Sequence, residues 1–323
     1  MSEQMSDAVP ADGVQQPSLG PMPRPVAFAF SGGGGQGAIQ VGMLKALADA
    51  GLSPDLVAGT SVGALHAAVV AEDGHLPRST ERLERIWHDL RRRNLLPRSW
   101  PGQALSVWRT GHLHSSRKLR RLIGRTLTAQ RFDQLRLPLT VVTAEVMTGH
   151  VRWLTEGQLA PALLAATALP GIFPPVTVDD RLLWDAGSVA NVPLQPAITA
   201  GAGSLVVLDA GDACHLDAPP RGIPDALFLA LRIALRQRVL VETPTVAERL
   251  PVLYLPRPCV TSRQLLDFDR SHEMIEPSRQ MVATFLAGHA TPTAGRMSGG
   301  PHTHDEADPL VLDAGPTPIP RRR

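Results

Sequence analysis

The sequence predicts an α/β protein with a mostly parallel central sheet and a helical insertion. Two consecutive segments, 25–51 and 55–71, each combine a short apolar run, a glycine-containing turn and a helical pattern. Repeated strand–turn–helix units are typical of a parallel sheet with right-handed crossovers. A basic segment from 78 to 132 carries helical patterns and no strand pattern, which predicts the insertion.

The two units are justified by their apolar patterns. The continuous apolar run Pro25–Phe30 predicts a strand that is buried on both faces. Apolar residues at helical spacing over Ala38–Leu47 predict a helix that stops at Gly51. Asp55–Gly59 then predicts a second strand, and the small apolar residues of 62–71 predict a second helix that is buried at its start.

The predicted insertion has two amphipathic helices with basic outer faces. Fifteen Arg or Lys residues and four acidic residues lie between Arg78 and Arg136. Solvated helix faces explain this charge best, and a surface that attracts anionic lipid head groups is the alternative. A nucleic-acid partner is not expected, because no zinc spacing, recognition-helix pattern or aromatic interleaving accompanies the basic residues.

Further elements follow the insertion. The segment 225–242 predicts a long helix, and because its apolar residues cover more than one stripe, we expect it to be packed on both sides. A final helix is predicted within 268–286. Strands are predicted at 137–146, 150–154, 204–210 and 251–256.

Composition sets the boundaries of the domain. Residues 1–24 and 288–323 are rich in small and turn-forming residues without apolar periodicity, so we expect disordered tails around a single domain at 25–287. Cys214 and Cys259 match no metal or redox spacing. With no apolar run near twenty residues and no leader pattern, we expect a cytoplasmic protein without metal or cofactor, and peripheral membrane association stays open.

The glycine-rich stretch SGGGGQG, residues 31–37, predicts an anion-binding loop at a helix start. Gly32, Gly34 and Gly37 fit a dinucleotide pattern, which requires an acidic residue at the end of the second strand. Asp55 begins that strand, and a serine follows its end. This arrangement favours the other interpretation, a loop that binds the oxyanion of an ester under attack.

That serine lies in a second glycine motif, GTSVG, at a predicted strand-to-helix turn. This is the context of a nucleophile elbow, in which the serine hydroxyl points out at a helix N-terminus. The motif consists of Gly59, Thr60, Ser61, Val62 and Gly63.

A serine nucleophile needs a base, and none of the eleven histidines stands out. His66 follows Ser61 on the same predicted helix, where a packing role is favoured. Asp185 ends a short apolar run beside Trp184, and partial burial there would raise its pKa and its strength as a base. From the residues alone, a turn aspartate remains the favoured alternative.

Four motifs in one order resemble the patatin-like phospholipase family. They are SGGGGQGAIQVG at 31–42, GTSVG at 59–63, AATALPGIFPPV at 165–176 and WDAGSVANVP at 184–193. The resemblance implies a three-layer α/β/α sandwich, and a lipid acyl hydrolase that cleaves phospholipids or other fatty acyl esters. It implies Ser61 as nucleophile and Asp185 as its only base, in a dyad without histidine. The implied oxyanion hole is Gly32, Gly33, Gly34, Gly35, Gln36 and Gly37, chiefly the N–H groups of Gly33 to Gly35.

The sequence departs from the family pattern at two positions. Gln36 stands where Arg or Lys is usual, so a positive charge beside the loop is missing. Ala186 precedes Gly187 in the aspartate motif where glycine is usual, and a positive φ there would cost about 1 kcal/mol of strain. A short-chain carboxylesterase or thioesterase and a catalytically weak patatin-like regulator therefore remain alternatives, and the oligomeric state stays open.

Overall fold

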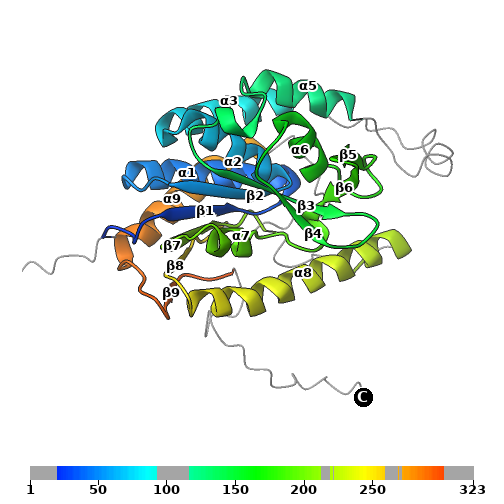
Figure 1. Ribbon diagram of the computed structural model, residues 1–323. Coiled ribbons are helices and arrows are strands. Elements are labelled where there is room, and N and C mark those ends of the chain that lie inside the picture. The colour runs from blue at the N-terminus through cyan, green and yellow to red at the C-terminus, as the bar shows by residue number, and fades with distance from the viewer. Residues whose placement is uncertain are drawn as a thin grey trace, which may run out of the picture.

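The computed structural model describes residues 20–92, 116–211, 219–220, 222–258, 268 and 271–301. These residues form three layers, with a central sheet between two layers of helices (Figure 1). The strand order is β5-β6-β3-β2-β1-β7-β8-β9, and β4 pairs with β3. The strands from β3 to β9 along this order run parallel, whereas β4, β5 and β6 add antiparallel pairs at one side. The predicted fold class is confirmed.

The elements have the following bounds. The strands are β1 Val26–Phe30, β2 Leu56–Thr60, β3 Leu139–Glu145, β4 Val151–Leu154, β5 Val176–Val178, β6 Arg181–Asp185, β7 Ser204–Leu208, β8 Val252–Tyr254 and β9 Met297–Ser298. The α-helices are α1 Ala38–Asp49, α2 Val62–Asp73, α3 Leu76–Arg92, α5 Arg117–Thr126, α6 Leu159–Ala166, α7 Leu194–Thr199, α8 Ile223–Ala247 and α9 Ile275–Gly288. Short 3₁₀ turns are η1 Gly34–Gly37, η2 Phe132–Gln134, η3 Ala186–Ser188 and η4 Ser271–Met274.

The strand register brings the glycine motifs together. β1 and β2 are buried along their whole length, as their continuous apolar sequences predict. They are parallel, and Phe30 pairs with Gly59. The loop that follows β1 and the turn that follows β2 therefore leave the same edge of the sheet. The order reverses between β1 and β7, and such a switch point is where open α/β sheets bind ligands.

Two apolar cores lie on the two faces of the sheet. The larger core joins α1, α2, α3 and α9, and its largest buried side chain is Trp87. The smaller core joins α7 to the C-terminal end of α8 through Leu194, Ala197, Val246 and Ala247. Figure 1 shows these two helix layers above and below the strands.

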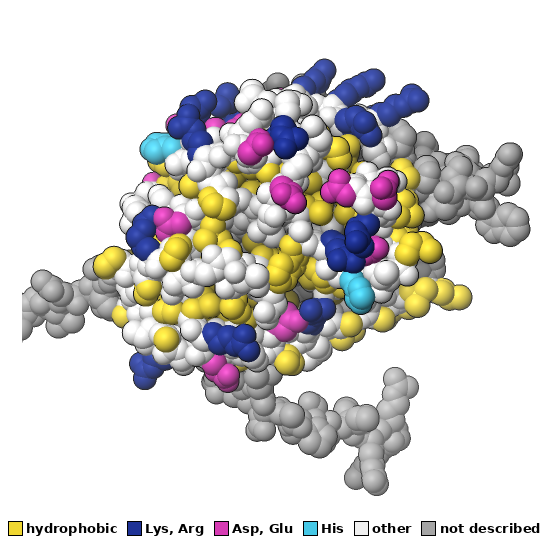
Figure 2. All heavy atoms as spheres, viewed as in Figure 1, with side chains coloured by type: hydrophobic (Ala, Val, Ile, Leu, Met, Phe, Trp, Pro, Cys, Tyr) yellow, Lys and Arg dark blue, Asp and Glu magenta, His cyan; other side chains and the backbone are white. Residues whose placement is uncertain are grey.

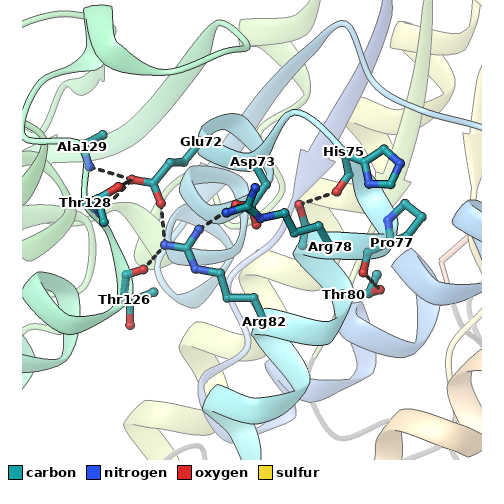
Figure 3. A network of polar contacts seen from close by, with 11 residues as sticks. Glu72, Asp73, His75, Pro77, Arg78, Thr80, Arg82, Thr126, Thr128 and Ala129 are labelled. Carbon is teal, nitrogen blue, oxygen red and sulfur yellow. Dashed lines mark hydrogen bonds and ion pairs between the residues drawn. The ribbon is translucent and has the colours of Figure 1, made fainter.

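In the described residues of the basic insertion, α3 and α5 are helical as predicted, and contacts with α2 attach them to the domain. Arg82 on α3 binds the carboxylates of Glu72 and Asp73, where α2 ends, and the carbonyl of Thr126 at the end of α5 (Figure 3). Glu72 in turn accepts hydrogen bonds from the N–H groups of Thr128, at 2.7 Å, and Ala129, at 2.6 Å. These bonds lock α3 and α5 to α2. Residues 93–115, between α3 and α5, lie outside the described part of the chain.

Two features lie outside the expected domain limits of 25 and 287: Met22 is buried in the larger core, and β9 adds to the sheet beyond residue 288. One expectation about the helices needs correction. The long helix α8 is not packed on both sides: Ile223 and Leu227 are 76% and 67% exposed. The apolar sequence of α8 predicts a helix, but it does not predict whether a neighbouring element packs on that helix.

Candidate active site

Ser61 occupies a strained turn between β2 and α2. Its φ of 55° and ψ of −129° lie in a region that non-glycine residues rarely adopt. The flanking glycines make this turn possible. A Cβ on Gly59 would lie 2.4 Å from the Gly63 carbonyl oxygen, and one on Gly63 would lie 2.4 Å from the Ser31 carbonyl oxygen. The predicted strand–turn–helix geometry of the elbow is present.

Asp185 ends β6 and is fully buried beside this turn. Its carboxylate accepts a hydrogen bond from the Gly187 N–H at 2.7 Å. Burial raises the pKa of Asp185 to about 6, while the neighbouring Ser61 hydroxyl and the Gly187 N–H act in the opposite direction. The serine and a buried carboxylate with a raised pKa are therefore neighbours in the fold.

The glycine loop lies against the same serine. A Cβ on Gly32 would lie 3.1 Å from Ser61 Cβ and 2.5 Å from Asn191 Oδ1. A Cβ on Gly33 would lie 2.6 Å from Ala210 Cβ, and one on Gly37 would lie 2.9 Å from both Trp87 and Val62 side-chain atoms. Side chains at these three positions would therefore push the loop away from the elbow.

Two N–H groups of the loop hold its shape. The Gly32 N–H donates to the Asn191 carbonyl at 3.0 Å, and the Gln36 N–H donates to the Gly33 carbonyl at 2.9 Å. Within the described part of the chain, no hydrogen bond is recorded from the N–H groups of Gly33, Gly34 or Gly35. These three N–H groups are the donors available to an anion.

Gln36 lies in the buried turn η1 and is 5% exposed. Its side-chain oxygen Oε1 has no hydrogen-bond partner. A buried amide oxygen without a partner costs about 1–3 kcal/mol. Gln36 therefore does not replace, through any recorded contact, the cation that is usual at this position of the family.

The segment after Asp185 is tied to both glycine motifs. Thr60 Oγ1 donates to the Ala190 carbonyl at 3.0 Å, next to the bond from Gly32 to Asn191. The Asp185 N–H donates to the Ala168 carbonyl at 3.1 Å, within the third motif. All four motifs named from the sequence therefore meet at one edge of the sheet.

Sequence reasoning did not single out Asn191. Its carbonyl holds the glycine loop, and its Oδ1 lies 3.6 Å from where a Cβ on Gly187 would be. Its position inside the fourth motif, between Ala190 and Pro193, is the one sequence feature that could have marked Asn191 as a site residue. Asn191 links the loop to the aspartate motif.

Ala186 causes no strain at the site. The positive-φ non-glycine residues are Ser61, Asp179 and Asp180, so Ala186 needs no glycine-like conformation. Its methyl group is fully buried among Val142, Ala144 and their neighbours. The backbone strain at Ala186 that the sequence comparison suggested is therefore not observed.

His66 is close in sequence to Ser61, but its ring is engaged elsewhere. Trp87 Nε1–H donates to His66 Nε2 at 3.0 Å, so Nδ1 carries the proton that is shared with Gln40 Oε1 at 2.7 Å. Gln40 Nε2 donates to the carbonyls of Ser31 and Leu208, both at 2.9 Å. Burial lowers the pKa of His66 to about 3. His66 supports the glycine loop as a neutral packing residue.

A second buried polar cluster lies behind the loop. Tyr254 Oη donates to Asp209 Oδ2 at 2.6 Å, and burial together with the Asp209 carboxylate raises the Tyr254 pKa. Arg257 is 7% exposed, and its Nε and Nη1 have no hydrogen-bond partner among the described residues. A Cβ on Gly211 would lie 2.4 Å from Arg257 Cζ, and Gly211 follows the alanine that contacts Gly33. A positive charge therefore stands near the loop, supplied by the segment after β8.

No group of three or more His, Cys, Asp or Glu side chains in the described part of the chain is arranged to hold a metal ion. No helix in that part of the chain has the length and apolarity needed to cross a membrane.

The fold and site define an α/β protein with a serine on a strained elbow and a buried carboxylate beside it. A glycine loop next to the serine has three N–H groups that donate no hydrogen bond to another described residue. The sequence pattern of the family described as patatin-like phospholipase matches residues 28–198. The chain belongs to the patatin-like phospholipase family.

Relatives match this chain over part of their own length. Patatin-like phospholipase domain-containing protein 7 of Rattus norvegicus is 29% identical over 206 residues, which cover 62% of this chain and 14% of the relative. Lysophospholipase nte1 of Emericella nidulans is 27% identical over 211 residues, covering 63% of this chain and 13% of the relative. This chain thus spans a small part of the length of these relatives.

Among solved structures, the crystal structure of VipD from Legionella pneumophila is similar, with a TM-score of 0.46 and 14% identity. The match covers 84% of this chain and 68% of that chain.

Proposed function

We propose that this protein is a serine acyl hydrolase of phospholipase A or lysophospholipase type, cleaving fatty acyl esters through Ser61 and Asp185. The contact between the Ser61 hydroxyl and the buried Asp185 carboxylate carries the proposal. Membership of the patatin-like phospholipase family, and relatives named as lysophospholipases, support a lipid ester as substrate.

In the proposed reaction, Ser61 Oγ attacks the ester carbonyl carbon while its proton passes to Asp185. The carbonyl oxygen becomes an oxyanion. When the tetrahedral species collapses, the C–O bond to the alcohol breaks and the alcohol leaves with the proton from Asp185. A water then gives one proton to Asp185 and attacks the acyl carbon of the acyl-serine. The bond between that carbon and Ser61 Oγ breaks, the fatty acid leaves, and Ser61 Oγ takes the proton back from Asp185.

The loop supplies the donors for the oxyanion in this scheme. The N–H groups of Gly33, Gly34 and Gly35 have no recorded acceptor within the described residues, and the loop that carries them contacts Ser61. Loss of one such donor typically costs about 2.7–4 kcal/mol of transition-state stabilisation. The nearby guanidinium of Arg257 adds positive potential from behind the loop.

The substrate is proposed to approach from a lipid surface, so the protein would associate peripherally with membranes from the cytoplasm. A short-chain esterase or thioesterase would use the same two residues on soluble substrates. A catalytically weak regulator is the alternative that the unpartnered Gln36 oxygen favours, because that amide gives the loop no recorded support.

Turnover of acyl esters of increasing chain length, with lysophosphatidylcholine alongside, tests the proposal. We expect hydrolysis of long acyl chains and its loss in both Ser61→Ala and Asp185→Asn. Full activity in Asp185→Asn would reject the dyad. Activity on short chains alone would favour the esterase, and no turnover by the folded wild-type protein would favour the regulator.

A further inference from the structure

Most of helix α8 leaves its apolar side chains in solvent. Ile223 is 76% exposed, Leu227 67%, Ile233 55% and Val241 62%. Packing on the smaller core is seen toward the C-terminal end of the helix, at Val239 and Val246. In Figure 1 the N-terminal end of α8 extends to the lower right of the sheet, and Figure 2 shows hydrophobic side chains there.

Ile223, Leu227, Leu231 and Val241 form one apolar face, hereafter the α8 face, whereas Ile233 lies about 80° around the helix from Ile223 on the side away from Leu231. Ile223, Leu227 and Leu231 follow one another at intervals of four, and Val241 returns to the same side five turns after Ile223. Between residues 226 and 241 the sequence contains Arg232, Arg236 and Arg238 and no acidic residue, while Asp225 and Glu242 flank this stretch and Glu242 pairs with Arg238.

A second segment adds to this side of the molecule. Trp153 on β4 is 41% exposed and pairs directly with Val142 on β3, so the two side chains share a sheet face. Val142 packs with Ala186 and Val189 on that face. Arg238 of α8 donates to the Val189 carbonyl. Trp153 and α8 therefore both flank the segment that follows Asp185.

We propose that the α8 face, with Trp153, inserts into the surface of an anionic lipid bilayer and holds the candidate active site against it. An apolar helix face with nearby arginines is typical of helices that lie in the bilayer interface, and Trp is favoured at that depth. The inference rests on the proposed function, because a fatty acyl substrate resides in that bilayer. The basic helices α3 and α5 then have no required role in binding.

Vesicle co-sedimentation tests this surface directly. Vesicles of phosphatidylcholine with phosphatidylglycerol are mixed with Leu227→Glu/Leu231→Glu, and with Met281→Glu as control, since Met281 on α9 is 40% exposed and Leu231 39%. All variants carry Ser61→Ala, so no lipid is consumed and binding is measured apart from hydrolysis. We expect about tenfold or greater loss of binding in the double variant and none in the control.

A fluorophore provides a second readout. This measurement does not require the Leu227→Glu/Leu231→Glu variant to fold. A polarity-sensitive dye on Leu227→Cys, with Cys214→Ser and Cys259→Ser, should shift to the blue when vesicles are added. The same dye on Met281→Cys should not. Equal vesicle binding by all variants, or a dye at 227 that stays in water, would overturn the proposal. So would a dimer that the double variant dissociates without changing vesicle binding, because the α8 face would then join two copies.

Discussion

The Ser61 hydroxyl lies beside the buried carboxylate of Asp185, close enough to lower the pKa that burial raises, where β2 and β6 both end next to β3. The glycine loop contacts the same serine, since a Cβ on Gly32 would be 3.1 Å from Ser61 Cβ. The proposed base and the proposed oxyanion donors thus lie next to one hydroxyl.

Hydrolysis should depend on pH through Asp185. Because burial raises its pKa to about 6, the carboxylate is ionised and able to accept a proton only above that pH. We expect kcat on a soluble ester to fall about tenfold per pH unit below 6 and to level off above 7. A profile that stays flat down to pH 4.5, in protein shown to be folded by circular dichroism, would be inconsistent with this base.

The raised pKa of Asp185 also makes the free energy of unfolding depend on pH, and the ionised form that is needed for catalysis is the less stable one in the fold. Between pH 4 and 6 the folded state holds the Asp185 proton more tightly than the unfolded state, so the free energy of unfolding falls as pH rises through this window. At pH 7 Asp185 is ionised in both states, and burial of its charge lowers the free energy of unfolding by the full amount. Asp185→Asn should therefore raise the free energy of unfolding at pH 7 by on the order of 2 kcal/mol, and by little at pH 4. Urea denaturation at both pH values measures the difference, and an equal effect at both would argue against it.

His66 should matter for stability and not for proton transfer. His66→Phe leaves the Trp87 N–H and the Gln40 amide oxygen without partners, so we expect a loss of about 1–3 kcal/mol per unpaired group in the free energy of unfolding. His150→Phe is the control, since that ring is exposed. If His66→Phe abolished turnover while leaving the midpoint of denaturation unchanged, a direct role for the ring would have to be considered.

Gly63 should tolerate no side chain. A Cβ there would meet the carbonyl oxygens of Ser31 and Phe30 at 2.4 and 2.5 Å, both on the backbone, so Gly63→Ala should destabilise or unfold the domain. Gly124→Ala in α5 is the matched control, because nothing lies within 4 Å of its Cβ position. That control should gain about 0.5–1 kcal/mol from helix propensity. Thermal denaturation compares the two, and equal midpoints would refute the steric argument.

Arg257 should act on the reaction through its charge. Arg257→Gln removes the buried cation behind the loop, and we expect kcat on a soluble ester to fall about tenfold with KM little changed. Arg257→Lys should recover part of the loss. The exposed Arg249→Gln is the control. Equal kcat in Arg257→Gln and wild type would show that the Arg257 charge does not stabilise the oxyanion.

Local sequence signals predicted the parts of the site that depend on one segment each. The apolar runs of β1 and β2 and the glycines around Ser61 specify strands and a sharp turn without reference to the rest of the chain. Asp185 was different, because from the residues alone a turn aspartate was favoured. Its burial and its contact with Ser61 arise from the pairing of β6 with β3, which no local pattern encodes.

Other features depend on partners distant in sequence. The bonds from Thr60 to Ala190 and from Trp87 to His66 join elements whose approach is decided by packing. β9 contains two residues in a segment without periodicity, so its pairing with β8 gives no signal. The apolar pattern of α8 predicted a helix, but the absence of a cover over its N-terminal part could be seen only in the structure.

The most direct test of the central claim is covalent labelling by a fluorophosphonate probe, followed by mass spectrometry of the tryptic peptides. We expect one adduct, on Ser61, that is absent in Ser61→Ala and forms much more slowly in Asp185→Asn. An adduct on another residue, or labelling that persists in Ser61→Ala, would contradict the assignment of Ser61 as the nucleophile.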